Sequence, residues 1–121
     1  MRILVVDDSK AMRMIVARSL RQAEIGAFEM AEAPDGEAAL ALIVGGGGFD
    51  LVIADWNMPK MTGIELLTAV RNAGLAVDFG FVSAETTAEF QRRAKDAGAR
   101  FFVTKPFTPE VLREAVLGGR A

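Results

Sequence analysis

The sequence has no cysteine and no histidine among its 121 residues. Without cysteine the chain can form no disulfide, thiolate nucleophile or cysteine-ligated metal site. Without histidine it offers no Ser-His-Asp catalysis, no histidine-ligated zinc and no phosphohistidine of its own. The side chains that remain for chemistry are those of Asp, Glu, Lys, Ser and Thr.

The sequence also lacks a basic excess and a long apolar run. Its 14 Lys and Arg residues face 16 Asp and Glu residues, which gives a formal net charge of −2, whereas nucleic-acid-binding domains are normally basic. No segment approaches the roughly 18 consecutive apolar residues of a membrane span. The N-terminus is typical of a strand and not of a signal peptide. We therefore expect a cytoplasmic protein that binds neither nucleic acid nor membranes directly.

The length fits one domain, residues 1–121, and we expect no separate output domain. Short apolar segments alternate with longer segments of helical periodicity. The short ones are predicted strands: Ile3–Val6, Phe28–Ala31, Leu51–Ala54, Phe79–Val82 and Phe101–Val103. The predicted helices are about Lys10–Gln22, Gly36–Val44, a helix opened by Thr62, about Thr86–Asp96, and a helix that begins at Thr108 and Pro109. This alternation predicts an α/β fold with a doubly wound, five-stranded parallel sheet between two layers of helices.

Polar side chains follow four of the five predicted strands, at the end where an open parallel sheet binds its ligands. They are Asp7 and Asp8 after the first strand, Asp55 after the third, Ser83 after the fourth and Lys105 after the fifth. The second strand, which we expect at the sheet edge, offers only Glu32. Each residue alone has an ordinary explanation as a cap, a turn residue or a solvated side chain. Their joint occurrence indicates a functional site.

Three carboxylates at one rim repel one another. At a separation of ~4 Å each pair costs on the order of 1 kcal/mol in water and ~4 kcal/mol at an effective dielectric of 20. A hard divalent cation relieves this repulsion, and a few carboxylates with open positions suit Mg²⁺, which also accepts phosphate oxygens. Lys105 would add a positive charge and Ser83 a hydroxyl donor. The residues therefore predict a place for a phosphoryl group beside Mg²⁺.

Four motifs occur in a specific order and spacing: "DDSK", "ADWNMPKMTGIELL", "SAE" and "KPF". With them the chain resembles, over its whole length, the receiver domain of bacterial two-component response regulators, and especially the single-domain CheY-like chemotaxis regulators. The resemblance implies a flavodoxin-like three-layer sandwich with strand order 2-1-3-4-5. It also implies a stand-alone phosphoprotein of a phosphorelay, which is not an enzyme beyond catalysing its own phosphorylation and dephosphorylation.

The resemblance assigns the acceptor and metal roles by position. Asp55 would be the phosphoacceptor for the phosphohistidine of a sensor histidine kinase. The side chains of Asp8 and Asp55 and the backbone carbonyl of Asn57 would bind Mg²⁺, while Asp7 would act mainly through a water. Asn57 and Glu85, two residues beyond the acceptor and the switch hydroxyl, would tune the lifetime of the aspartyl phosphate.

The resemblance also assigns the switch. Lys105, joined to Pro106 by a cis peptide bond, would pair with Asp55 and then with the phosphoryl oxygens. The Ser83 hydroxyl would be drawn to the phosphoryl group, and the ring of Phe102 would move into the space near it. The changed surface of the fourth helix, fifth strand and fifth helix would then control a downstream protein.

Two departures leave the downstream partner open. Phe102 stands where chemotaxis regulators commonly have tyrosine, so no phenolic hydroxyl can bond a partner, and Phe102 as an ordinary core residue is the alternative. The fourth helix begins "ETTAEF" without the lysines of the chemotaxis type. Flagellar motor control, another protein target, and a phosphate sink or relay intermediate without motor output all remain open, as does dimerisation on phosphorylation. Phe90 is either the anchor of this helix or an exposed contact.

Two other functions share the architecture. A Mg²⁺-dependent phosphohydrolase with Asp55 as nucleophile would want a second acid two residues later, where this chain has Asn57. A flavodoxin-like flavin binder would want a hydroxyl-rich phosphate loop after the first strand, where "DDSK" is acidic. Both fit the residues less well than a receiver does.

Overall fold

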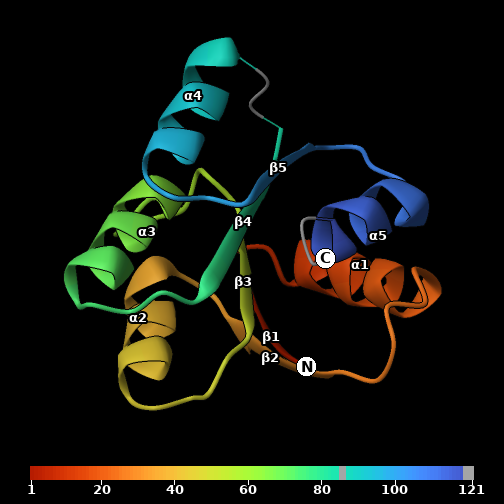
Figure 1. The fold of residues 1–121 in the computed structure, drawn as a ribbon, viewed down its shortest axis with the longest axis horizontal. Coiled ribbons are helices and arrows are strands. Elements are labelled where there is room, and N and C mark those ends of the chain that lie inside the picture. The colour runs from red at the N-terminus through yellow and green to blue at the C-terminus, as the bar shows by residue number, and fades with distance from the viewer. Residues whose placement is uncertain (85–86, 119–121) are drawn as a thin grey trace.

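The computed structural model describes residues 1–84 and 87–118, in which strands and helices alternate along the chain (Figure 1). The strands are β1 (Arg2–Val6), β2 (Glu29–Ala33), β3 (Leu51–Ala54), β4 (Asp78–Ser83) and β5 (Phe101–Thr104). The helices are α1 (Lys10–Gln22), α2 (Gly36–Val44), α3 (Gly63–Asn72), α4 (Ala88–Asp96) and α5 (Pro109–Leu117). None of these helices is both long enough and apolar enough to cross a membrane.

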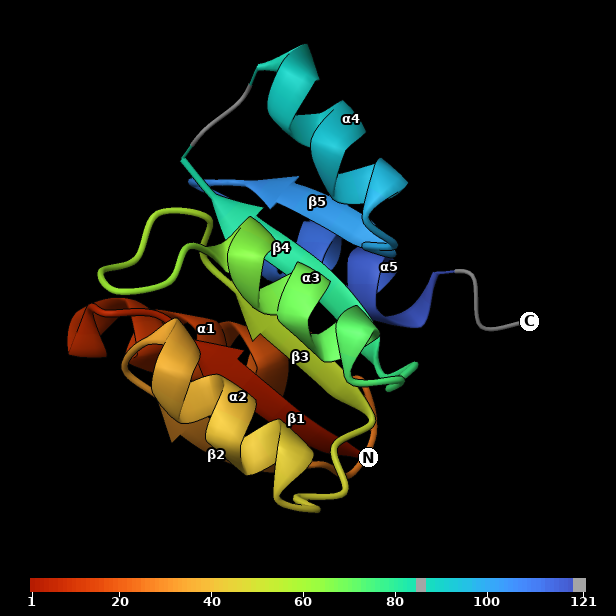
Figure 2. The ribbon, with the colours of Figure 1, turned by 90° about the vertical axis from the view of Figure 1, so that its left-hand side faces the viewer.

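The strands form one parallel sheet in the order β2-β1-β3-β4-β5. Helices α2, α3 and α4 cover one face of this sheet, and α1 and α5 cover the other (Figures 1 and 2). The predicted doubly wound α/β sandwich, its strand order and the edge position of the second strand are therefore confirmed. The order puts β1, β3 and β4 next to one another in the middle of the sheet.

Alternate residues of the central strands point to the two helical layers. Leu4 and Val6 of β1 face α2, α3 and α4, and Ile3 and Val5 face α1 and α5. Because both faces are covered, every residue of β3 is buried, and a central strand is apolar throughout instead of alternating. Asp7 and Asp55 are the first residues after these buried apolar strands.

Each of the five helices begins at a capping side chain, and Thr62 and Thr108 were identified in the sequence as helix starts. The Ser9 hydroxyl accepts the Met12 N–H at 3.2 Å, so α1 starts directly after the acidic pair. Thr62 and Glu65 form a capping box at α3, in which the backbone N–H and the hydroxyl of Thr62 donate to the Glu65 carboxylate and lower its pKa. Thr108 caps α5 with Pro109 in the first turn. The chain thus passes within a few residues from β1, β2, β4 and β5 into a helix, whereas the loop between β3 and α3, residues 55–62, is longer.

Several predicted boundaries move: those of β1, β4 and β5 by one residue, and those of β2 and α4 by up to two. β2 is Glu29–Ala33, whereas the apolar pattern predicted Phe28–Ala31, because Phe28 packs under the sheet with the α1 and α5 layer while the polar residues of this edge strand continue the pairing with β1. Helix α4 begins at Ala88 with Thr87 as its N-cap. Glu85 and Thr86 lie outside the described residues.

Gly63, the first residue of α3, approaches the backbone of the β3–α3 loop. Its N–H donates to the Trp56 carbonyl at 2.8 Å. A Cβ atom at this position would overlap the carbonyl oxygen of Asp55 and the ring of Phe81, which is fully buried. A side chain here would therefore displace the residue that follows β3.

We predict that Gly63→Ala lowers the free energy of unfolding by about 1–3 kcal/mol because of this overlap. The sign is diagnostic, since glycine-to-alanine changes without a clash usually raise stability by about 0.4–1 kcal/mol. Urea denaturation measures the difference, with Asn72→Ala at the exposed end of α3 as the control, expected within about 0.5 kcal/mol of wild type. A Gly63→Ala protein as stable as wild type would contradict the close approach.

Candidate functional site

Three carboxylates meet at the carboxyl end of the sheet. Asp7 follows β1 and Asp55 follows β3, and these strands are neighbours with Val6 beside Ala54. One carboxylate oxygen from each of Asp7, Asp8 and Asp55 lies within 4.8 Å of the others. Asp7 is buried, Asp55 half-buried and Asp8 exposed. The cluster is thus open to solvent on one side and closed by the protein on the other.

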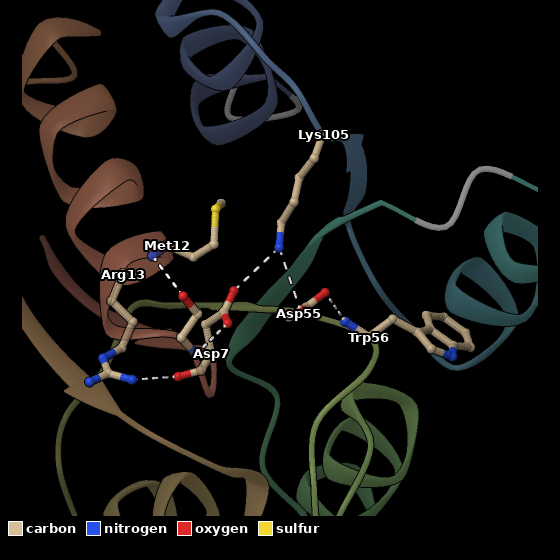
Figure 3. Close-up of polar contacts among 7 residues, drawn as sticks. Asp7, Met12, Arg13, Asp55, Trp56 and Lys105 are labelled. Atoms are coloured by element: carbon tan, nitrogen blue, oxygen red, sulfur yellow. Dashed lines mark hydrogen bonds and ion pairs between the residues drawn. The ribbon is translucent and has the colours of Figure 1, made fainter.

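Lys105 reaches the same cluster from β5. Its Nζ lies 3.3 Å from an oxygen of Asp7 and 3.6 Å from an oxygen of Asp55, and its side chain is 17% exposed (Figure 3). The Lys105 N–H donates to the Ser83 carbonyl at 2.9 Å, and the Lys105–Pro106 peptide bond is cis. The ammonium group therefore bridges the carboxylates that follow two different strands.

Backbone groups fix the other oxygens of the two inner carboxylates. Asp7 Oδ1 accepts the Ser9 N–H at 2.9 Å, and Asp55 Oδ1 accepts the Trp56 N–H at 2.8 Å. The backbone N–H of Asp55 donates to the Val6 carbonyl at 3.0 Å, which continues the sheet ladder past the strand. Each carboxylate therefore has one oxygen on a backbone amide and one toward Lys105.

Burial raises the pKa of Asp55 above its usual value of 3.8. The charge of Lys105 acts against this shift, while the negative charge of Asp7 adds to it. The pKa stays raised although two hydrogen-bonding groups favour the ionised form, so Lys105 alone does not compensate for the burial and crowding of the carboxylates. A further positive charge at the rim would favour ionised Asp55.

The donor set fits a hard divalent cation. Three carboxylate oxygens within one small cluster, with Asp8 open to solvent, suit a metal that takes oxygen ligands and keeps several waters, as Mg²⁺ does. Asn57 lies two residues beyond Asp55, exposed in the loop between β3 and α3. The side chains of Asp7, Asp8 and Asp55 are the ones that could hold the ion.

Ser83 is the last residue of β4 and is completely buried. β4 lies between β3, which Asp55 follows, and β5, which Lys105 follows. Ser83 therefore lies between these two residues along the edge of the sheet. The structure thus places four of the five strand-end residues, Asp7, Asp8, Asp55 and Lys105, in one cluster, with Ser83 at the same edge of the sheet. Glu85 is outside the described residues.

An aromatic cluster stands beside Asp55 on the α4 side. The Trp56 ring, in a residue only 3% exposed, lies 4.8 Å from the ring of Phe90, 5.1 Å from Phe81 and 6.2 Å from Phe102, measured between ring centroids. The guanidinium of Arg93 stands 5.4 Å from the Trp56 centroid. Phe90 is thus the anchor of α4, and both Phe90 and Phe102 of β5 are half-buried against the buried rings of Trp56 and Phe81.

Sequence reasoning missed one charged pair at the site. Arg13, in the first turn of α1, donates to the Asp7 carbonyl at 2.6 Å (Figure 3). It also donates to Glu32 at 2.8 Å. The only available signals were an arginine one turn after the acidic pair and a glutamate near the end of the edge strand. Neither stands out, because charged residues at such positions are usually solvated.

The comparisons with known proteins agree with this geometry. The family model described as the response regulator receiver domain matches residues 3–117. The chain is 42% identical over 118 residues to the chemotaxis protein CheY of Pseudomonas aeruginosa, covering 96% of this chain and 93% of that one. It is 40% identical over 116 residues to the chemotaxis protein CheY-3 of Vibrio cholerae, covering 94% and 87%.

The solved structures to which the chain is similar include further response regulators. The chain is similar to the chemotaxis response regulator CheY4 of Vibrio cholerae with a TM-score of 0.81 and 36% identity, covering 95% of this chain and 94% of that one. It is similar to the receiver domain of the Francisella response regulator 1452 with a TM-score of 0.84 and 28% identity, covering 95% and 92%.

The raised pKa of Asp55 predicts a pH-dependent effect of Asp55→Asn without metal. A carboxyl whose pKa is higher in the folded than in the unfolded chain lowers stability progressively as pH rises from the unfolded value, near 3.8, through the folded one. In EDTA we therefore expect Asp55→Asn to be more stable than wild type at pH 7, and the difference to disappear below about pH 4.

Thermal or urea unfolding across this pH range measures the difference. The control is Asp96→Asn, which removes an exposed carboxylate at the end of α4 and should leave stability within about 0.5 kcal/mol of wild type. An Asp55→Asn protein less stable than wild type at pH 7 would show that ionised Asp55 is favoured by the fold.

Proposed function

The chain belongs to the response regulator receiver domain family, whose members are signalling proteins, and from this premise we propose that it is a CheY-like switch phosphorylated on Asp55. The observation that carries the proposal is the arrangement of Lys105 between Asp7 and Asp55 in a cluster of three carboxylates. Such a site suits the transfer of a phosphoryl group to a carboxylate, because it combines a nucleophilic oxygen with positive charge for the equatorial oxygens.

In the proposed reaction a carboxylate oxygen of Asp55 attacks the phosphorus of a phosphohistidine on a sensor histidine kinase. The P–O bond of an acyl phosphate forms, the P–N bond breaks, and the leaving imidazole nitrogen keeps the electron pair. The bond from the Trp56 N–H to Asp55 Oδ1 leaves the other oxygen, Oδ2, as the one that faces Lys105. The protein mainly positions the nucleophile and compensates charge, as phosphoryl transfer requires.

Asp7, Asp8 and Asp55 are the side chains that would hold Mg²⁺, with the Asn57 carbonyl as a proposed backbone ligand. When bound, the ion would neutralise negative charge on the carboxylates and on the phosphoryl oxygens. Lys105 lies between the carboxylates of Asp7 and Asp55 and reduces their repulsion. The backbone amides of Ser9 and Trp56 fix the orientation of these carboxylates.

Phosphorylation would be read through the residues between Asp55 and α4. The modification adds about −1.5 to −2 charges and strong acceptor oxygens, which would draw Lys105 and the Ser83 hydroxyl. The ring centroid of Phe102 lies 6.0 Å from that of Phe81 and 6.2 Å from that of Trp56. A movement of Asp55 and Trp56 would therefore displace Phe102 and with it β5. Glu85 and Asn57 are proposed to tune the lifetime of the acyl phosphate.

The output surface is proposed to be the α4–β5–α5 face. A groove of about 490 Å³ runs between α4 and β5, with Phe101 and Phe102 in its lining and Arg92 and Lys95 among its polar residues. Phe102 thus belongs both to the aromatic cluster and to this groove. The surface is suited to a downstream protein in chemotaxis-type signalling in the cytoplasm, as the chemotaxis proteins similar to this chain suggest.

The phosphohydrolase alternative has less support. A hydrolase would need an acid two residues after the nucleophile, and Asn57 stands there. A phosphate sink or relay intermediate uses the same chemistry at Asp55 and differs only in needing no output. Phe102 is half-buried and contacts both the aromatic cluster and the groove, which favours a switch that a downstream protein recognises.

We predict that Asp55→Asn abolishes phosphorylation by acetyl phosphate and Mg²⁺, because the amide is not a nucleophile for phosphorus. Intact-mass spectrometry measures the added phosphoryl group, and the fluorescence of Trp56, the only tryptophan, reports the change at the site. Asp96→Asn, which keeps Asp55, should be phosphorylated like wild type. A phosphoryl group found on Asp7 or Asp8 of the Asp55→Asn protein would contradict the acceptor assignment.

Lys105→Ala should still accept a phosphoryl group but should lose most of the Trp56 fluorescence change that follows phosphorylation in wild type. The ammonium group is the contact that would move between the free carboxylates and the phosphoryl oxygens, so its removal separates chemistry from switching. Lys60→Ala, at an exposed lysine of the β3–α3 loop, is the control. A wild-type fluorescence amplitude in phosphorylated Lys105→Ala would remove Lys105 from the switch.

A further inference from the structure

The side chain of Arg13 turns back from the first turn of α1 to the loop that carries Asp7 and Asp8. Its Nη1 donates to the backbone carbonyl of Asp7 at 2.6 Å, and its Nε donates to Glu32 Oε1 at 2.8 Å. The Arg13 side chain is only 13% exposed, although most arginines on the surface of a helix extend into water. Arg13 therefore serves the loop before its own helix.

The last part of β2 supports this contact from the other side. Glu32, which holds the guanidinium, precedes Ala33, whose carbonyl accepts the Asp7 N–H at 3.2 Å. The peptide groups on both sides of Asp7 are thus fixed from outside the loop: the N–H by the β2 backbone, and the carbonyl by Arg13. The carbonyl of Asp7 belongs to the peptide group that joins Asp7 to Asp8.

The geometry of the contact requires arginine. A guanidinium has several N–H groups in one rigid plane and can donate to a carboxylate and to a carbonyl at the same time, whereas the lysine ammonium is a point charge on a flexible chain. Arg13 uses two different nitrogens for its two partners. A lysine could keep the charge but not both hydrogen bonds in this fixed arrangement.

We infer that Arg13, oriented by Glu32, is a positioning residue that sets the Asp7–Asp8 peptide group and thereby the directions in which both carboxylates face the cation. This inference rests on the proposed function, in which these carboxylates hold Mg²⁺. Removing a residue that orients a metal ligand by a hydrogen bond, without contacting the metal, lowers metal affinity about 10–100-fold. Arg13 touches no reacting atom and acts only through the loop.

The charge of Arg13 gives the opposite expectation. A cation beside a cation site weakens metal binding through repulsion, so removing the guanidinium would strengthen Mg²⁺ binding if charge were its only effect. Removing Glu32, an anion at nearly the same place, would then weaken it. Positioning instead predicts that both substitutions weaken Mg²⁺ binding, because both release the Asp7 carbonyl from its fixed donor.

The test is a Mg²⁺ titration of Trp56 fluorescence in the unphosphorylated protein, with Arg13→Gln, Arg13→Lys and Glu32→Ala. We expect the Kd for Mg²⁺ to rise about tenfold in Arg13→Gln and several-fold in Arg13→Lys. Arg18→Gln, an exposed arginine of the same helix with the same change in charge, should bind like wild type. Circular dichroism verifies that each variant is folded, and Arg13→Lys is the mildest change should Arg13→Gln fail to fold.

A double variant separates the two explanations further. If Glu32 acts through Arg13, Arg13→Gln with Glu32→Ala should bind Mg²⁺ about as weakly as Arg13→Gln alone, whereas independent charge effects would largely cancel. Tighter or unchanged Mg²⁺ binding by Arg13→Gln overturns the inference and leaves the proposed function standing. Absence of any Mg²⁺ response in the wild-type protein overturns both.

Discussion

The mutual repulsion of three carboxylates is the interaction on which the arrangement of the site depends. Asp7 and Asp55 follow neighbouring strands, so the same hydrogen bonds that form the sheet also force their charges together. Lys105 offsets part of this cost, and backbone amides of Ser9 and Trp56 offset more. The pKa of Asp55 nevertheless stays raised by burial. The folded protein is therefore stabilised when a cation binds beside these carboxylates, and such binding can shift the protein between conformations.

The strand order determines which groups can take part. Because β1, β3, β4 and β5 are consecutive in the sheet, the residues after them form one row at the edge. The residue after β5 is two strands away from Asp55, and only a long side chain crosses that distance; Lys105 does so over the end of β4, where Ser83 lies. β2 lies at the outer edge, next to β1 alone, and contributes no residue to the cluster. It contributes support instead, through Glu32 and the Ala33 carbonyl.

The predictable features follow from short-range patterns. The buried strands are uninterrupted apolar runs, and the residues of the cluster come directly after them, so both could be located from the sequence with the strand order that the family resemblance implied. The edge strand was placed too early because Phe28 is half-buried against the α1 and α5 layer without being paired in the sheet. Arg13 and Phe90 were not resolved, since their roles depend on which distant segment packs against them. Helical periodicity gives the face of a residue but not the direction of a long side chain that bends back along the chain.

The site has a fixed half and an adaptable half, and their contacts explain why. On the β1–β2 side, Asp7 is held through both of its peptide groups by Ala33 and Arg13, and every partner belongs to a strand or to the start of a helix. On the α4 side, Asp55 is joined to Trp56, whose ring contacts other rings by packing alone. Hydrogen bonds fix direction, whereas ring contacts allow neighbouring orientations at small cost. In the proposed function the cation would be held by Asp7 and Asp8 of the fixed half together with Asp55, which stands at the boundary between the two halves. The proposed conformational response would belong to the other half, because a phosphoryl group on Asp55 would alter the bond to the Trp56 amide, and the Trp56 ring contacts Phe90 of α4 and Phe102 of β5.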